Sequence, residues 1–218
     1  MIEYKYCTGC SACENICPVD AIQLEADDEG FYYPRILSDR CVHCGACHAI
    51  CDETYGCASN RTGGGWGKTY AGYAKDARIR LESSSGGVFS LLAGEAIASA
   101  GTVYGALTDE TLEVIHASVR DEQGLAALRK SKYVQSRIGT TFRVLKKDLA
   151  DGKNVVFSGT PCQIAGLKAF LGAEPANLLT VDFVCHGVPS PKLWRMYLKW
   201  LEKKLGAPVV NVQFRNKR

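Results

Sequence analysis

Apolar residues follow a helical spacing in some stretches of this chain and form short continuous runs in others. Between residues 87 and 99 they recur at three- and four-residue intervals from Val88 to Ala96, which predicts a helix. Short runs such as 154–158 predict buried strands. Such segments alternate along the second part of the chain, which predicts a mixed sheet flanked by helices. The expected strands are 70–74, 102–107, 112–117, 154–158, 178–184 and 209–214, and the expected helices are 87–99, 121–129, 136–150, 161–171 and 191–205.

The first fifty residues carry a different pattern, in which two short apolar segments flank a polar turn. Residues 21–25 and 31–36 predict two strands, and Asp-Asp-Glu-Gly at 27–30 predicts the turn between them. Pro34 cannot donate a backbone hydrogen bond, so it suits the edge of this hairpin. We expect the hairpin to shield the neighbouring cysteines from water.

Cysteines dominate the chemistry of this region. Residues 7–18 follow the pattern C-x2-C-x2-C-x3-C-P, and residues 41–51 repeat the cysteine spacing with Asp52 in place of the proline. This is the ligand pattern of bacterial two-cluster ferredoxins, in which the fourth cysteine of each run binds the other cluster. We therefore expect two [4Fe–4S] clusters, one on Cys7, Cys10, Cys13 and Cys51 and the other on Cys41, Cys44, Cys47 and Cys17.

A disulfide framework and a zinc site are the competing interpretations. Disulfides indicate a secreted protein, and no signal peptide opens the chain. Zinc sites usually use two cysteine pairs with a long gap, not triplets plus one. Cys57 is expected to be a spare buried thiol, and His43 and His48 to be surface residues. Asp52 either lowers the potential of a nearby cluster or is a solvated carboxylate.

Composition narrows the class of protein. The chain has 218 residues, 46% of them hydrophobic, and its net charge of +3 is too small to indicate nucleic-acid binding. No apolar run reaches the length of about eighteen residues that a membrane span needs. Eleven cysteines used as reduced thiols predict a cytoplasmic protein. We expect a two-cluster ferredoxin-like domain at 1–57, a Gly- and Ser-rich linker at 58–70 and an α/β domain at 71–218.

The α/β part contains two candidate ligand contacts near its start. The loop 83–87, Ser-Ser-Ser-Gly-Gly, precedes a predicted helix and is either a seat for a phosphate or an ordinary helix cap. Lys132 and Tyr133 are either a ligand contact or a surface pair.

Two further cysteines follow predicted strands. Thr160, Cys162 and Gln163 lie at a strand-to-helix junction, and Cys185 ends the next strand. If these strands are neighbours, both cysteines lie at one crevice, because ligands of α/β sheets gather at strand carboxyl ends. They are then redox partners, ligands of another cluster or core residues, and spacing does not decide among these.

Several motifs together carry a resemblance to a known family. They are the two cysteine runs and the segments 84–90, 131–136, 157–167 and 185–191. With these the chain resembles the coenzyme F420 hydrogenase/dehydrogenase beta subunit family in its ferredoxin-fused form. Members are normally longer, so the resemblance implies that this chain lacks a C-terminal part.

The resemblance implies a flavoprotein, usually with FAD, that moves electrons between a two-electron carrier and iron–sulfur clusters. F420 or NAD(P)H would be the carrier, and a redox protein or a small molecule the partner. Ser84, Ser85, Gly86 and Gly87 would bind a flavin phosphate, and Thr160 to Gln163 would form the crevice wall. No side chain need act as a nucleophile.

Cys162 and Cys185 are expected to line the flavin crevice without binding a third cluster. With Cys57 they make three thiols, one fewer than a cube needs. The competing functions are a ferredoxin-type electron-transfer protein with a docking domain and no flavin, and a reductase in glycan or cofactor biosynthesis.

Overall fold

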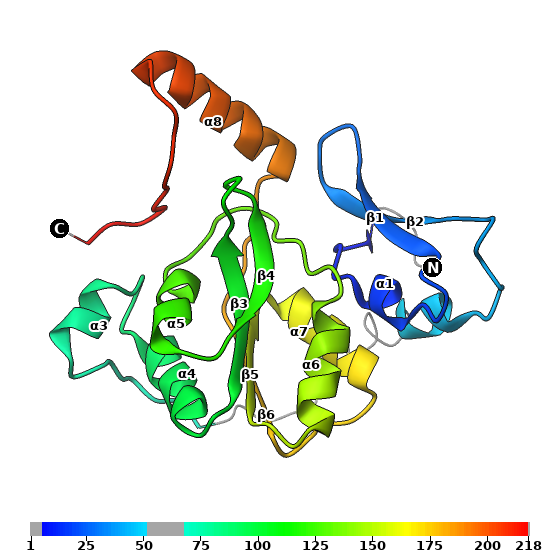
Figure 1. Ribbon diagram of the computed structural model, residues 1–218, viewed down its shortest axis with the longest axis horizontal. Coiled ribbons are helices and arrows are strands. Elements are labelled where there is room, and N and C mark those ends of the chain that lie inside the picture. Colours follow the sequence, from blue (N-terminus) through cyan, green and yellow to red (C-terminus); the bar gives the residue numbers. More distant parts are fainter. Residues whose placement is uncertain (1–5, 52–67, 218) are drawn as a thin grey trace.

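The computed structural model describes residues 6–51 and 68–217 (Figure 1). Asp52, Cys57 and most of the predicted linker lie outside these residues, so the expectations placed on them stay predictions, as does the division of the chain at 58–70.

The N-terminal part contains a helix and a hairpin. Helix α1 (Ala12–Ile16) lies within the first cysteine run, and β1 (Ile22–Ala26) pairs antiparallel with β2 (Tyr32–Ile36). The side chain of Asp27 closes the turn by accepting the amide of Phe31 at 2.8 Å. Residues 46–51, within the second run, are also helical. The predicted hairpin is confirmed.

The second part is built on a four-stranded sheet in the order β4-β3-β5-β6. Strands β3 (Thr102–Thr108), β5 (Val155–Gly159) and β6 (Leu178–Asp182) run parallel, and β4 (Val114–Val119) is antiparallel to β3. The mixed sheet is therefore confirmed. The chain as a whole, an α/β part beside a ferredoxin-like module, agrees with the expected α+β fold class.

Helices cover both faces of this sheet, as Figure 1 shows. Strand side chains alternate between the faces: Val103 and Val156 pack with α4 (Val88–Ala98) and α5 (Glu122–Leu128). Tyr104 and Phe157 face the other way, toward α6 (Thr141–Ala150) and α7 (Pro161–Leu171). A short helix, α3 (Ala77–Leu81), precedes α4.

The ferredoxin-like part shares its core with the α/β part. Ala12 of α1 and Ile50 belong to the same buried cluster as Phe142, Ile164 and Phe170. Helix α1 contacts both α6 and α7. The module is thus packed on one face of the sheet's helical layer, and apolar burial holds it there.

Helix α8 (Pro191–Leu205) is anchored at its N-terminal end. The Ser190 hydroxyl donates to the carbonyl of Glu29 at 2.6 Å, in the β1–β2 turn. The Trp194 indole donates to the carbonyl of Leu112 at 2.7 Å, in the β3–β4 turn. The start of α8 therefore ties the two hairpins together.

Two predicted strands are wrong. Residues 70–74 form no strand, and Tyr70 is 82% exposed. Residues 209–214 also form no strand, because Val209, Val212 and Phe214 pack against the cluster around Trp194 instead of pairing with the sheet. These apolar residues are buried against the helix that carries Trp194. An alternating pattern does not tell whether the apolar side pairs into a sheet or packs on a helix.

One helix begins later than expected. Residues 136–140 do not belong to α6, because Arg137 pairs with β4: its amide donates to Val114 at 3.0 Å and its carbonyl accepts from His116 at 2.9 Å. Gly139 then turns the chain with a φ of +54° before Thr141 starts the helix. The segment 131–139 is therefore a strap across the end of the sheet.

Candidate iron–sulfur and cofactor sites

The two cysteine runs adopt the same backbone turn. The residues on either side of the second cysteine have left-handed φ values in both: +66° at Gly9 and +64° at Ser11, then +53° at His43 and +76° at Gly45. Glycine takes this conformation without strain, and each run places one glycine at one of the two positions. The repeat in the sequence is thus also a repeat in the backbone.

Four thiols from both runs lie together against the α/β part. This inner set consists of Cys7, Cys10, Cys13 and Cys51. Burial raises the pKa of Cys10 to about 11 and that of Cys13 to about 12. The charges of Cys7 and Cys51 contribute to both raised pKa values, so these thiols are neighbours. The last cysteine of the second run therefore lies with the triplet of the first.

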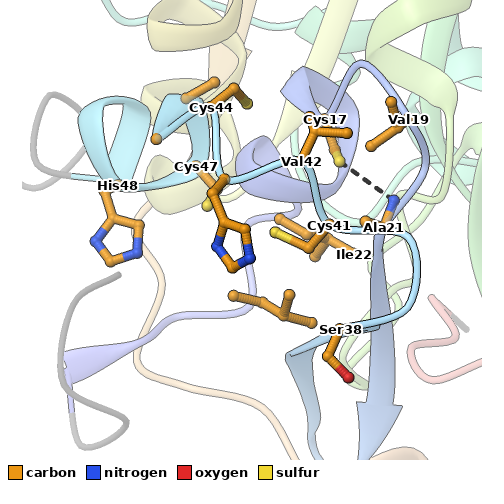
Figure 2. Close-up of a pocket in the computed structure, with 14 residues that line it drawn as sticks. Cys17, Val19, Ala21, Ile22, Ser38, Cys41, Val42, Cys44, Cys47 and His48 are labelled. Atoms are coloured by element: carbon orange, nitrogen blue, oxygen red, sulfur yellow. Dashed lines mark hydrogen bonds between the residues drawn. The ribbon is translucent and has the colours of Figure 1, made fainter.

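The other four cysteines line one cavity of about 230 Å³, and form the outer set: Cys17, Cys41, Cys44 and Cys47. Figure 2 shows Cys17 approaching this cavity from the end of α1, Cys41 and Cys44 from the later loop, and Cys47 from the helical segment 46–51. Such a volume far exceeds the ~10–15 Å³ that one water needs. The last cysteine of the first run thus lies with the triplet of the second.

The arrangement of these thiols suits a [4Fe–4S] cube. Among residues 6–51 and 68–217, no three metal-binding side chains converge on one point that could hold a single ion. A cube instead spreads its thiolates over separate irons, so its ligands surround a space. Two sets of four thiols supply the four ligands that each of two cubes needs.

Backbone amides point at sulfur in both sets. The amide of Ala21 donates to Cys17 Sγ at 3.2 Å (Figure 2). In the inner set, the amides of Gly9 and Ala12 lower the pKa of Cys7 and Cys10 against the larger effect of burial. Amide hydrogen bonds to sulfur favour added negative charge, and they are one of the ways in which a protein sets a cluster's potential.

The inner set lies directly against helix α7. A Cβ atom placed on Gly166 would be 3.0 Å from Cys10 Sγ, so a larger residue there would press on the thiol. The strap residue Gln135 is equally close on the other side: a Cβ on Gly9 would meet Gln135 Nε2 at 2.7 Å. Gln135 also accepts the Tyr32 amide at 2.9 Å. The α/β part therefore encloses the inner set from two directions.

Arg143 of α6 joins the two parts through the end of α1. Its guanidinium donates to the carbonyls of Glu14, Asn15 and Cys17 at 2.7–2.9 Å. These carbonyls lie at the helix C-terminus, where no intrahelical donor remains for them. Asn15 adds a hydrogen bond to the Gly139 carbonyl at 2.8 Å. Sequence reasoning missed this contact, because nothing local marks Arg143 among the other surface-like cations of its helix.

The Ser/Gly loop lies at the start of α4. Ser84 accepts hydrogen bonds from the amide and hydroxyl of Ser131, at 2.8 and 3.1 Å. Among the described residues, no side chain caps the α4 amides, and Gly87 enters the helix with a φ of +83°. Lys217 donates to the Ser85 carbonyl at the rim of the loop. The loop therefore offers free amides and a nearby cation, which together suit an anion.

Gly86 has a packing role in this loop. A Cβ there would lie 2.9 Å from the Gly72 carbonyl oxygen, and Ala74 donates its amide to Gly86 at 2.7 Å. A change at Gly86 would therefore disturb the fold of the loop as well as any ligand.

The motif at the start of α7 is fixed by hydrogen bonds. Thr160 and Gln163 form a capping box, and Thr160 Oγ1 lies 3.1 Å from Cys162 Sγ. Gln163 Nε2 donates to Ser136 Oγ at 3.0 Å, and Ser136 lies 3.0 Å from His116 Nδ1. Cys162 is close enough for its charge to raise the pKa of Cys7 and Cys10. This motif thus meets the inner set, a neighbour that the sequence did not indicate.

His116 was also missed. It is buried, stacks on Phe157 and lies 3.2 Å from the Ser158 carbonyl through Nε2. Its pKa is lowered to about 4, chiefly by burial and in part by the Lys132 charge, while the Ser158 hydrogen bond opposes the shift. A neutral ring with Nε2 protonated satisfies both contacts.

The remaining candidates have different environments. Lys132 donates to the carbonyls of Ala127 and Arg129 at 2.8 Å, so it caps α5, and burial lowers its pKa to about 8. Strands β5 and β6 are neighbours, as the crevice interpretation required. Cys185 beyond β6 is exposed, whereas Cys162 is half-buried.

Comparisons with known proteins agree with this geometry. The family model "4Fe-4S dicluster domain" matches residues 6–54. An uncharacterized ferredoxin from Methanocaldococcus jannaschii is 35% identical over 52 residues, which cover 23% of this chain and 77% of that ferredoxin. The family model for the C terminus of the coenzyme F420 hydrogenase/dehydrogenase beta subunit matches residues 152–218. Together these two matches correspond to a ferredoxin-fused form of this beta subunit family.

The two family-model matches indicate the general function of the chain. The chain is an iron–sulfur electron-transfer protein of an oxidoreductase family, and its dicluster domain carries two [4Fe–4S] clusters. Within the part of the chain that the structure describes, no helix has the length and apolarity to cross a bilayer.

Proposed function

We propose that this chain is a flavin-dependent oxidoreductase in which the inner thiols hold one [4Fe–4S] cluster and the outer thiols hold the other. Electrons pass between a two-electron carrier at the α/β part and a redox partner at the outer end. The carrier is F420-like or a nicotinamide.

The unequal setting of the two cysteine sets carries this proposal. The inner set is enclosed by α7 and the strap, whereas the outer set opens to the surface beside Val42, which is 60% exposed. A chain that relays electrons needs one cluster next to the electron source and another cluster within reach of the redox partner. A free ferredoxin needs no such enclosure.

The chain's own residues divide the work. A flavin would supply two-electron uptake and one-electron release, and each cluster would carry one electron. The free amides of the Ser84–Gly87 loop would seat a phosphate, with Lys217 beside them. Thr160 to Gln163 and the strap would form the wall between that seat and the inner set. The hydrogen bond between Ser84 and Ser131 ties the seat to the strap.

Anaerobic purification followed by iron, sulfide and flavin quantification tests the proposal. We expect about eight irons, about one flavin per chain and reduction by reduced F420, NADH or NADPH. Two clusters without flavin absorbance, and no response to these donors, would favour the ferredoxin-type protein with a docking domain.

A variant of the loop tests the phosphate seat. Ser85 is exposed and already has a Cβ, so Ser85→Asp adds a carboxylate without the clash expected at Gly86. We expect flavin to be lost while iron content stays constant, because like charges repel in the seat. Ser85→Asn is the neutral control of equal size. Equal flavin content in both variants would remove this loop from the site.

A further inference from the structure

One face of α7, which includes Cys162 of its first turn, lies against the inner set. Cys162 and Gly166 are four residues apart, so they share one face of the helix. Gly166 contacts Cys10, and Cys162 lies one turn closer to the helix start, near Cys7 and Cys10. Cys10 therefore lies beside the middle of this eleven-residue helix, and Cys162 in its first turn, at the positive end, is one turn away on the same face.

The donors of this turn are almost all used. Pro161 has no amide hydrogen, and the Gln163 amide is taken by the Thr160 hydroxyl in the capping box. The Cys162 amide has no partner among the described residues. Because Thr160 Oγ1 accepts from Gln163, its own hydrogen is free to bond Cys162 Sγ at 3.1 Å. That leaves the Cys162 thiol hydrogen for an acceptor outside the turn.

The turn is also held rigidly. Gln163 is tied to Ser136, and Ser136 to the buried His116 of β4. The Thr160 amide donates to Gln163 Oε1 at 3.0 Å. The dipole of α7, the Cys162 amide and the Cys162 thiol therefore keep a fixed orientation. Groups that stabilise a charge are most effective when their orientation is fixed in advance.

We propose that Cys162, at the positive end of α7, is a positioning residue that raises the reduction potential of the inner cluster relative to the outer one. Reduction adds a negative charge, and a fixed donor at a helix N-terminus stabilises that charge. Within the described residues, the outer cavity is lined only by residues of the N-terminal module and has no such helix from the α/β part. The inference rests on the proposed assignment of the inner thiols to one cluster.

The experiment is an anaerobic redox titration of the full chain, followed by electron paramagnetic resonance. A Cys17→Ser variant, expected to lose the outer cluster, first assigns the two signals. For Cys162→Ala we expect the reduced-to-oxidised ratio of the inner cluster at a fixed potential to fall about tenfold, a shift of ~59 mV for one electron. The outer cluster should not shift.

Two variants make the result specific. Cys162→Ser keeps a hydrogen-bond donor and should keep the inner potential near that of the unaltered chain. Lys168→Gln changes a charge at the opposite end of α7, where Lys168 pairs with Glu174, and should shift neither cluster.

Each other outcome overturns the inference. An unchanged inner potential, an equal shift of both clusters or a rise in Cys162→Ala would show that Cys162 does not stabilise the reduced state. Loss of about four irons in Cys162→Ala would make Cys162 a ligand. Absence of two distinct signals in the unaltered chain would instead refute the assignment on which the inference rests.

Discussion

The inner and outer cysteine sets share one backbone turn and differ in what surrounds them. Gly9 of the inner run is pressed against Gln135 and the Tyr32 carbonyl, whereas no described atom lies within 4 Å of a Cβ added to Gly45, the left-handed glycine of the outer run. The duplicated motif therefore builds two similar thiol cages. The α/β part packs against the inner cage and not against the outer one. This difference distinguishes the end of the module that faces the α/β part from the end that would face a partner.

The largest effect should follow from breaking the crossed ligation. Cys17→Ser should remove the cluster held by Cys41, Cys44 and Cys47, because Cys17 shares their cavity. Iron should fall from about eight to about four per chain, with the inner cluster's signal kept. Loss of the signal of the other triplet would contradict the crossed arrangement.

The next effect concerns the joint between the parts. Arg143→Ala leaves three helix-end carbonyls without their donor, so the free energy of unfolding should fall by ~3 kcal/mol. Lys147→Ala, on the exposed side of the same helix, should change it by less than ~0.5 kcal/mol. Chemical denaturation of both variants measures the difference, and equal losses would show that Arg143 does not hold the two parts together.

A smaller effect concerns acid. His116 has a pKa of about 4 when folded and ~6.5 when unfolded, so its neutral form contributes stability that is complete above pH 6.5. As pH falls from 7 to 5 this contribution should shrink by ~2 kcal/mol, because only the unfolded state gains the proton. The free energy of unfolding, measured at both pH values for the unaltered chain and for His116→Gln, isolates the contribution of His116. The same pH slope in the variant would contradict a buried neutral histidine.

The smallest effect compares the two glycines directly. Gly45→Ala should cost ~1 kcal/mol for a left-handed backbone alone. Gly9→Ala should cost ~1 kcal/mol more, because its Cβ would collide with the Tyr32 carbonyl oxygen as well as with Gln135. Equal costs by thermal unfolding would mean that the strap yields easily and does not enclose the inner set tightly.

Local patterns predicted what depends on neighbours in the sequence. The cysteine spacing indicated both clusters, and helical periodicity gave α4, α7 and α8 nearly to the residue. Contacts between segments that are distant in the sequence could not be predicted from these local patterns. Residues 209–214 have the alternation of a strand, yet Phe214 stacks on Trp194 at 4.9 Å. The placement of Cys162 beside the inner thiols depends on how α7 meets α1, which no spacing encodes.

Burial of the inner set beneath α7 also constrains the order in which the holoprotein is assembled. An iron–sulfur cube cannot pass through a packed helix, so its insertion must precede the closure of α7 and the strap over Cys10 or accompany it. Loss of the inner cluster past α7 would then require local opening of that interface, whereas the outer set includes the exposed thiol of Cys44. The inner cluster would then be inserted first, and the ferredoxin-like and α/β parts would pack together around it afterwards.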